Sequence, residues 1–221
     1  MPSRATIAKA LRALDGISPS TIGHVRQSGF MDCGIRALLP ERRALGPAFT
    51  IRAPGADGAI IAHALGQAAR GDVLVIDRCG ERVHAAWGGV LAHAARVLGL
   101  AGVIIDGLIC DPDELRREGV PVWHRGTTAL TTRRMGIGGD IGRTVSCGGV
   151  PVRPGDIILA DESGVLVLPA DEALATAATA HAMQAREAVT RARIDAGESM
   201  AAIAGTAALF AKTHTRIDTQ T

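Results

Sequence analysis

The feature that most constrains the fold is a pair of short apolar segments, Val73 to Asp77 and Gly102 to Asp106. Each is apolar on consecutive positions, which is typical of strands that are covered on both faces. The segment between them, Val90 to Leu98, is rich in small residues and is predicted to form a helix that ends at Gly99. A strand, a helix and a second buried strand in this order favour a layered α/β domain.

Helices at both ends and a strand-rich second half complete the predicted organisation. The other predicted elements are helices over 3–14, 20–27, 55–70, 113–117 and 171–196, strands over 48–53 and 120–123, and short strands between 144 and 169. No long linker separates domains, so we expect a single domain over residues 1–221. It would comprise N-terminal helices and a lead-in (1–45), a core (46–169), and a C-terminal helix with a polar tail (170–221).

The composition argues against some classes of partner and indicates the cellular compartment of the protein. Aromatic residues make up only 2% of the chain, so the core must consist of Ala, Val, Ile and Leu. The net charge is +2, and no basic cluster is interleaved with aromatic residues, which argues against a nucleic-acid surface. No apolar run reaches the ~18 residues that span a bilayer, so no membrane partner is expected. The four cysteines show no CxxC spacing, which favours reduced thiols in a cytoplasmic protein.

The candidate site lies around the central helix and the second strand. Gly88 and Gly89 precede the helix, and their missing side chains let free backbone N–H groups, including those of Val90 and Leu91, approach a substrate carboxylate. A plain tight turn is the alternative interpretation. Asp111 follows the strand and opens the next predicted helix, so its carboxylate could cap that helix or bind a metal.

Other polar residues near these strands leave alternatives open. Asp77 and Asp106, at two strand ends, could support a hydrated divalent cation or simply form turns. Cys110 could act as a nucleophile if a cation lowered its pKa, although buried inert cysteines are more common. Arg78 lies at a loop position where it could hold an anionic substrate, whereas solvation is the usual fate of such an arginine.

Three stretches resemble the RraA-like family in sequence and order. They are GADGAIIAHALGQAARGDVLVID, WGGVLAHAARVLGLAGVIIDGLICDPDELRREGVPVWHRGTT and GGVPVRPGDIILADESGVLVLP, within residues 46–193. This family contains regulator of ribonuclease E activity A and the class II 4-hydroxy-4-methyl-2-oxoglutarate/4-carboxy-4-hydroxy-2-oxoadipate aldolases.

The resemblance implies a swivelling β/β/α layered fold, with flanking N-terminal helices and a long C-terminal helix. It also implies homotrimers that can pair into hexamers, with the site between adjacent subunits and a small carboxylate as substrate. In the aldolases Mg²⁺ or Mn²⁺ binds a pyruvoyl group and stabilises the enolate. The resemblance implies that Asp111 is the metal ligand here and that the amides of Val90 and Leu91 hold the substrate carboxylate. Glu187 best matches the acid that a neighbouring subunit contributes.

The chain departs from the aldolase motif at two of its three side chains. Gly89 occupies the acidic position and Cys110 occupies the arginine position. Losing one such electrostatic contact typically costs about 2.7–4 kcal/mol of barrier. We therefore weigh three functions: a diverged metal-dependent carbon–carbon lyase resembling 4-hydroxy-4-methyl-2-oxoglutarate aldolase, a different enzyme that uses Cys110, and a non-catalytic protein-binding regulator like the ribonuclease E inhibitor.

Overall fold

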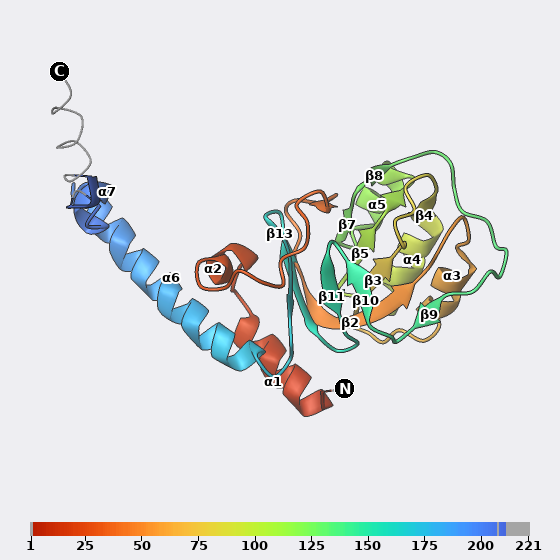
Figure 1. Cartoon of the computed structure of the whole chain (residues 1–221), viewed down its shortest axis with the longest axis horizontal. Coiled ribbons are helices and arrows are strands. Elements are labelled where there is room, and N and C mark those ends of the chain that lie inside the picture. The colour runs from red at the N-terminus through yellow and green to blue at the C-terminus, as the bar shows by residue number, and fades with distance from the viewer. Residues whose placement is uncertain (1, 207, 211–221) are drawn as a thin grey trace, which may run out of the picture. The chain divides into compact units, whose positions relative to one another are not determined.

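An eight-stranded sheet carries the first part of the protein, as the computed structural model shows (Figure 1). The strand order is β1-β7-β5-β3-β2-β12-β13, and β9 pairs with β2. The bounds are β1 Arg36–Ala37, β2 Ala44–Arg52, β3 Val73–Asp77, β5 Gly102–Asp106, β7 Val122–His124, β9 Asp140–Ile141, β12 Ile157–Asp161 and β13 Gly164–Leu168. The strands β2, β3, β5 and β7 run parallel, whereas β1, β9, β12 and β13 pair antiparallel with their neighbours. Both strands on which the sequence analysis opened have the predicted bounds.

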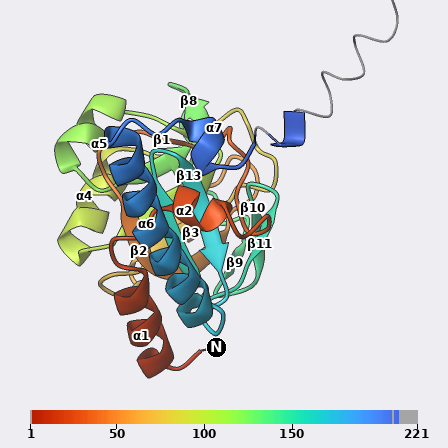
Figure 2. The same cartoon turned by 90° about the vertical axis from the view of Figure 1, so that its left-hand side faces the viewer.

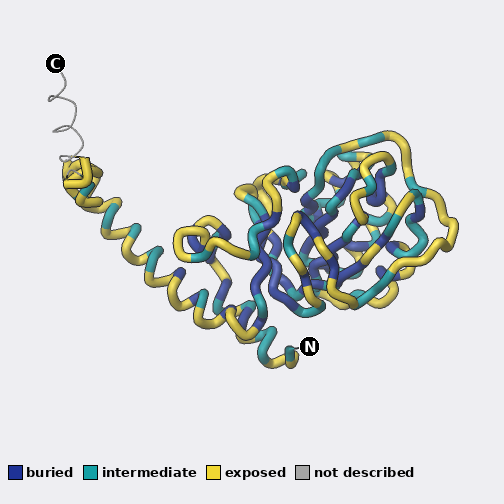
Figure 3. Tube along the Cα trace, in the orientation of Figure 1, coloured by how far each residue is buried: buried dark blue, intermediate teal, exposed yellow. Residues whose placement is uncertain are grey.

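Alternate residues of the central strands enter two separate cores, one on each face of the sheet. In β3, Leu74 and Ile76 pack with the helices, whereas Val73 and Val75 pack on the opposite face. All four side chains are fully buried, as is most of the central sheet (Figure 3). Burial on both faces explains why consecutive positions of this strand are apolar.

Helices cover one face of the sheet and a β-hairpin covers the other (Figure 2). The helix layer consists of α3 Ala59–Leu65, α4 Gly89–Leu98 and α5 Pro112–Glu118, and the hairpin consists of β10 Val145–Cys147 and β11 Val150–Val152. The helices α1 Arg4–Leu14 and α2 Pro19–Gly23 contact β12. Ser3 caps α1 by accepting from the amide of Thr6. The predicted layered α/β fold with N-terminal helices is confirmed.

The protein has a second, smaller sheet of three parallel strands. It consists of β4 Ala85–Trp87, β6 Leu108–Ile109 and β8 Gly126–Thr127, in the order β4-β6-β8. The strand β6 follows β5 after Gly107, and β8 follows β7 after Arg125. The strand β6, which lies between β5 and Asp111 and belongs to the smaller sheet, was not predicted from the sequence.

The structure describes residues 2–206 and 208–210, and it divides into two units, Met1–Ala178 and Thr179–Thr221. The second unit holds most of α6 Ala173–Asp195, the predicted C-terminal helix, and α7 Met200–Ile203. Most of the predicted polar tail lies outside the described residues. Within the described residues, no helix combines the length and apolarity needed to cross a membrane.

Gly46 is predicted to tolerate no side chain, because a Cβ there would lie 2.3 Å from the carbonyl oxygen of Gly71. We expect Gly46→Ala to lower the free energy of unfolding by about 1–3 kcal/mol, the usual range for overpacking. Urea unfolding monitored by circular dichroism would measure the change. Gly66→Ala is the control, since Gly66 has a negative φ of −69° and a Cβ there meets its nearest atom at 3.4 Å. Equal stability of both variants would contradict the prediction.

Candidate functional site

The ends of the three short parallel strands bring the candidate site together. The amide of Cys110 donates to the carbonyl of Trp87 at 2.9 Å, and the amide of Thr128 donates to the carbonyl of Ile109 at 3.0 Å. These bonds place the segments that follow β4, β6 and β8 side by side. The sequence stretch from Trp87 to Asp111 thus closes on itself through backbone hydrogen bonds.

Gly88 and Gly89 make room for side chains from another segment. A Cβ at Gly88 would lie 2.6 Å from Sγ of Cys110 and 2.8 Å from Oδ2 of Asp111. A Cβ at Gly89 would lie 2.0 Å from Oε2 of Glu114. Real Cβ contacts are longer than 3.0 Å, so the glycine pair serves close approach as well as the turn.

Asp111 directs its carboxylate to α4, away from the helix that it begins. Its φ is +53° and ψ is +47°, a left-handed conformation that Asp tolerates better than most residues. Its side chain makes no capping hydrogen bond to α5. Instead Oδ2 accepts from the amide of Gly89 at 3.3 Å. Of the two roles that the sequence left open, the helix cap is therefore excluded.

Glu114 is the functional candidate that the sequence analysis missed. It lies in the first turn of α5, three residues after Asp111, where two side chains share a helix face. Its carboxylate occupies the space above Gly89 that a side chain at that position would fill. The resemblance places an acidic residue at position 89, where this chain has glycine, and the carboxylate of Glu114 lies beside that position. The Asp-x-x-Glu spacing was the available signal.

Cys110 holds a neutral thiol against Asp111. Its Sγ lies 3.2 Å from Oδ2 of Asp111 and 3.6 Å from the carbonyl oxygen of Trp87. Burial raises the pKa of the Cys110 thiol to about 11, and the hydrogen bond and negative charge of Asp111 add to the rise. A thiol with this pKa is protonated at neutral pH, which weighs against a nucleophilic role in the metal-free protein.

A hollow of about 520 Å³ adjoins these residues. It is lined by Cys110, Asp111, Pro112, Thr127, Thr128, Ala129 and Thr131. The first turn of α4 lies next to Asp111, and no carbonyl of that helix can accept from the amides of Val90 and Leu91. The lining includes no arginine or histidine, so no side-chain cation there replaces the arginine of the motif. A larger hollow of about 630 Å³, lined partly by Arg143, Arg153 and Asp156, includes none of the predicted site residues.

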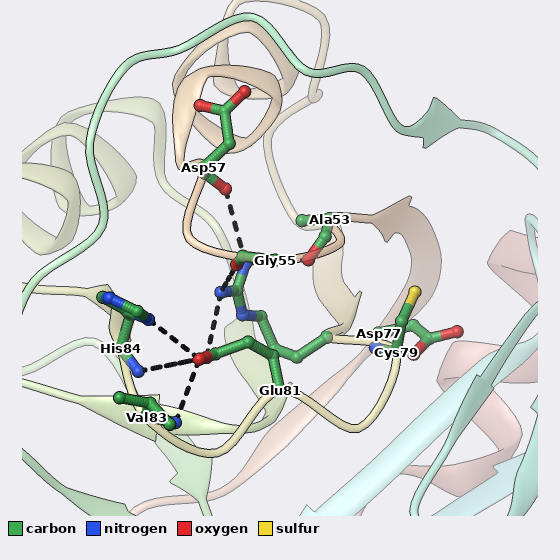
Figure 4. A network of polar contacts seen from close by, with 9 residues as sticks. Ala53, Gly55, Asp57, Asp77, Cys79, Glu81, Val83 and His84 are labelled. Atoms are coloured by element: carbon green, nitrogen blue, oxygen red, sulfur yellow. Dashed lines mark hydrogen bonds and ion pairs between the residues drawn. The ribbon is translucent and has the colours of Figure 1, made fainter.

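Arg78, predicted to hold an anionic substrate, is fully buried and does not line the hollow. Its guanidinium donates to the carbonyls of Ala53 at 2.7 Å and Gly55 at 2.5 Å, and it pairs with Glu81 at 3.2 Å (Figure 4). Its aliphatic stem fills the space beside Gly107, where a Cβ would lie 2.5 Å from Cγ of Arg78. Arg78 therefore ties the loops after β2 and β3 to the point where β5 passes into β6.

Asp57 holds residues 135–137, which follow the residues that line the hollow. Its carboxylate accepts from the amides of Met135 at 3.0 Å and Ile137 at 2.6 Å, and also from the amide of Ala59 at 2.8 Å. These hydrogen bonds lower the pKa of the Asp57 carboxyl. Asp57 thus holds the start of the glycine-rich segment 136–142, and the pairing of β9 with β2 holds its end.

Asp77 and Asp106, considered as cation ligands, hold other parts of the protein. Asp77 accepts from the amides of Cys79 and Ser146 at 2.7 and 3.2 Å. Asp106 accepts from the amide of Gly148 at 2.7 Å and from Arg125 at 2.6 Å. Both carboxylates therefore dock the hairpin β10–β11 onto the sheet.

Glu187 lies on α6 in the second unit. Its role as an acid supplied by a neighbouring subunit stays a prediction. Within residues 2–206 and 208–210, no three His, Cys, Asp or Glu side chains form a ready-made metal cluster. A metal at Asp111 would therefore depend on water or substrate as additional ligands.

Comparison with known proteins, by family model, sequence and structure, points to one family. Residues 16–167 match the model of the RraA-like family, described as Aldolase/RraA. A protein of Halalkalibacterium halodurans named "Putative 4-hydroxy-4-methyl-2-oxoglutarate aldolase" is 38% identical over 135 residues, which cover 61% of this chain. A protein of Hahella chejuensis with the same name is 35% identical, over 51% of this chain and 68% of its own length. The chain covers 64% of the H. halodurans protein, just under two thirds.

One of the similar solved structures is that of Streptomyces coelicolor RraAS2, which is described as an unusual member of the RNase ES inhibitor RraA protein family. It superposes with a TM-score of 0.73 at 27% identity, and the match covers 86% of this chain and 97% of that one. Relatives with the same fold thus include proteins named for lyase activity and proteins named for inhibition.

Replacing Arg78 is predicted to lower the stability of the protein, because Arg78 joins the loops after β2 and β3 to Gly107. We expect Arg78→Met to cost about 3–5 kcal/mol of unfolding free energy, because the carbonyls of Ala53 and Gly55 and the carboxylate of Glu81 would lose their buried charged donor. Chemical unfolding would measure this. Arg116→Met is the matched control, since that arginine is half exposed and pairs with an exposed Asp113, so its loss should stay within about 0.5 kcal/mol. Similar values for both variants would contradict the buried network.

Cys110 is predicted to resist alkylation at moderate pH. With a pKa of about 11, roughly 0.1% of this thiol is ionised at pH 8, about a hundredfold less than for a thiol with the ordinary pKa of 9.0. Iodoacetamide labelling in EDTA, followed by peptide mass spectrometry, should modify exposed Cys33 well before Cys110. The Cys110 rate should rise with pH up to about 11. Faster labelling of Cys110 than of Cys33 at pH 8 would instead support a nucleophilic thiol.

Proposed function

This chain belongs to the RraA-like family, and on that premise we propose that it is a divalent-metal-dependent carbon–carbon lyase of the aldolase or decarboxylase type. Its substrate would be a small oxo- or hydroxy-carboxylate. Relatives named as 4-hydroxy-4-methyl-2-oxoglutarate aldolases support the lyase class.

The observation that carries the proposal is the approach of two carboxylates, those of Asp111 and Glu114, to the glycine pair. Asp111 contacts the amide of Gly89, and Glu114 fills the place of the missing side chain at that residue. Mg²⁺ and Mn²⁺ are commonly held by one or two carboxylates, with water and substrate as the other ligands. The donor set therefore fits such an ion even without a third acidic residue.

Each element of the site has a role in this proposal. Asp111 and Glu114 would hold the metal, which when bound supplies Lewis-acid stabilisation of the negative charge that develops on the substrate. The free amides of Val90 and Leu91, at the positive end of α4, would bind the substrate carboxylate. The hollow beside Cys110 would receive the rest of the substrate.

Cys110 makes the expected reaction slower than that of an enzyme with arginine at this position. A neutral thiol cannot supply the fixed charge of a guanidinium. The lining of the hollow offers no other side-chain cation. We therefore expect decarboxylation or aldol cleavage at a rate roughly a hundredfold to a thousandfold below that of an arginine-bearing relative.

We also propose that the site is completed in a homotrimer or hexamer. Val90, in the first turn of α4, is 81% exposed, and the exposed apolar residues Val83 and Leu130 lie on segments next to β4. Apolar side chains exposed around a site favour coverage by another chain. Glu187 of an adjacent subunit would then be the additional acid.

The regulator hypothesis has one specific observation in its favour, the structural match to S. coelicolor RraAS2. Such a role would use protein contacts and would not depend on Asp111 or Glu114. The two functions are therefore separable by mutation.

Lyase activity is predicted to depend on both carboxylates. With Mg²⁺ or Mn²⁺ we expect turnover of oxaloacetate or 4-hydroxy-4-methyl-2-oxoglutarate, followed as pyruvate release. Asp111→Asn and Glu114→Gln should each lower kcat/KM by about a hundredfold or more, since each removes a charge from the site. Asp113→Asn is the matched control, because that carboxylate lies between them in sequence but is exposed and pairs with Arg116.

Two outcomes would overturn the proposal. One is the absence of turnover with either metal across a panel of oxo-acids. The other is equal activity of Asp111→Asn and the control variant. In either case, ribonuclease inhibition retained by Asp111→Asn would favour the regulator.

A further inference from the structure

We infer that the substrate of this site carries one carboxylate, and that its remaining part is an uncharged chain that bears hydroxyl groups. The inference rests on the proposed function, because it takes the hollow beside Asp111 as the place that receives the rest of the substrate. It narrows the small oxo- or hydroxy-carboxylate of that proposal to 4-hydroxy-2-oxo acids with a neutral, alcohol-bearing tail. The relatives named as 4-hydroxy-4-methyl-2-oxoglutarate aldolases are named for a substrate with two carboxylates.

The charge around the hollow disfavours a second carboxylate on the substrate. Among the described residues that line it, Asp111 is the one with an acidic side chain, and none is an arginine, a lysine or a histidine. Glu114, which lies beside Gly89, has the same sign of charge as Asp111. Glu187, the residue proposed to come from an adjacent subunit, is acidic as well. An anionic tail would therefore meet like charges without a side-chain counter-ion, which weakens its binding.

Three threonines supply most of the hydrogen-bonding side chains of the hollow. Thr127 belongs to β8 and pairs with Ile109 of β6, and the amide of Thr128 donates to the carbonyl of Ile109 at 3.0 Å. Thr131 forms a parallel bridge with Ala85 of β4. Backbone pairing with the short sheet therefore fixes the places from which all three hydroxyl groups are presented.

These hydroxyl groups are suited to the alcohol groups of a substrate. Oγ1 of Thr128 accepts from the amide of Leu130 at 3.3 Å, so its proton can still be donated to a ligand. Thr127 and Thr131 are exposed, and an alcohol can replace the water that solvates them. An alcohol can also donate to the carboxylate of Asp111, whereas a carboxylate tail can only accept. The hydrogen-bonding groups and the charge of the hollow thus favour the same kind of tail.

The reaction of such a substrate is a balanced aldol cleavage. The bond between C3 and C4 breaks and its electron pair stays on C3, so that the first three carbons leave as the enolate of pyruvate. The 4-hydroxyl group loses its proton as C4 becomes an aldehyde carbonyl, and C3 takes up a proton to give pyruvate. No oxidant, reductant or second substrate is needed, and the second product is a neutral hydroxyaldehyde.

Two 4-hydroxy-2-oxo acids that differ only at the tail test the inference, with the full-length protein and Mg²⁺ or Mn²⁺. The tail of 4,5-dihydroxy-2-oxopentanoate is a primary alcohol, that of 4-hydroxy-2-oxoglutarate is a carboxylate, and both release pyruvate. We expect kcat/KM to be at least about tenfold higher for the dihydroxy acid, since discrimination follows the difference in binding of the tails. Equal values, or a higher value for 4-hydroxy-2-oxoglutarate, would overturn the inference.

A cation added to the wall of the hollow should reverse this preference. Thr131 is exposed, so Thr131→Arg should leave the fold intact. We expect this variant to raise kcat/KM for 4-hydroxy-2-oxoglutarate by about tenfold, because the carboxylate tail gains a counter-ion. Thr144→Arg is the matched control, since it adds the same charge at an exposed threonine that lines the other hollow. Equal changes in both variants would contradict the placement of the tail beside Asp111.

Binding of two acids that lack the 4-hydroxyl group separates the inference from the lyase proposal. Neither 5-hydroxy-2-oxopentanoate nor 2-oxoglutarate can undergo the aldol cleavage, and calorimetry with Mg²⁺ compares their dissociation constants. Tighter binding of 2-oxoglutarate would refute the neutral tail, while pyruvate release that depends on Asp111 would still support the lyase. Tighter binding of 5-hydroxy-2-oxopentanoate without turnover of either 4-hydroxy acid would refute only the lyase.

Discussion

The candidate site depends on the absence of two Cβ atoms. At Gly88 and Gly89 the chain approaches Cys110, Asp111 and Glu114 more closely than any side chain would permit, with virtual contacts of 2.0 to 2.8 Å. The close approach lets the Gly89 amide donate to Asp111 and lets Glu114 lie over the first turn of α4. A side chain at position 89 would require the side chain of Glu114 to move from the place that it occupies here.

A buried arginine, Arg78, packs where β5 passes into β6 and so supports the short sheet β4-β6-β8. Arg78 gathers the carbonyls of Ala53 and Gly55 and fills the space that Gly107 leaves where β5 passes into β6. Burying a guanidinium is unfavourable unless its donors are satisfied, and here most of them are bound by carbonyls and Glu81, although Nε has no partner among the described residues. A residue that looks like an anion ligand in the sequence thus supports the fold of the site.

The sequence predicted the parts of the structure that depend on local patterns. The apolar runs of β3 and β5 were identifiable because burial on both faces leaves a direct signal, and the helix predicted over 3–14 begins at a serine that caps it. The role of Asp111 was not, since a positive φ decides where its carboxylate points and no composition rule reveals it. Glu114 was missed because an exposed glutamate in a first helical turn gives no signal in the sequence, and its position beside Gly89 arises only when α4 and α5 pack together. Arg78 was misjudged for the same reason, because burial of a loop arginine is a tertiary property.

The balance of charge around Cys110 gives a physical reason for a cation in the proposed reaction. Two carboxylates flank the start of α4, and their negative charge contributes to the raised pKa of the Cys110 thiol. The hollow has no side-chain cation to offset them. An anionic substrate that entered beside the exposed carboxylates of Asp111 and Glu114 would meet like charges, which disfavours its binding. The amides of Val90 and Leu91 offer only the partial positive charge of a helix terminus, about half an elementary charge. In the proposed reaction a divalent cation held by Asp111 and Glu114 would neutralise their two negative charges, so that the positive end of α4 could act on the substrate carboxylate.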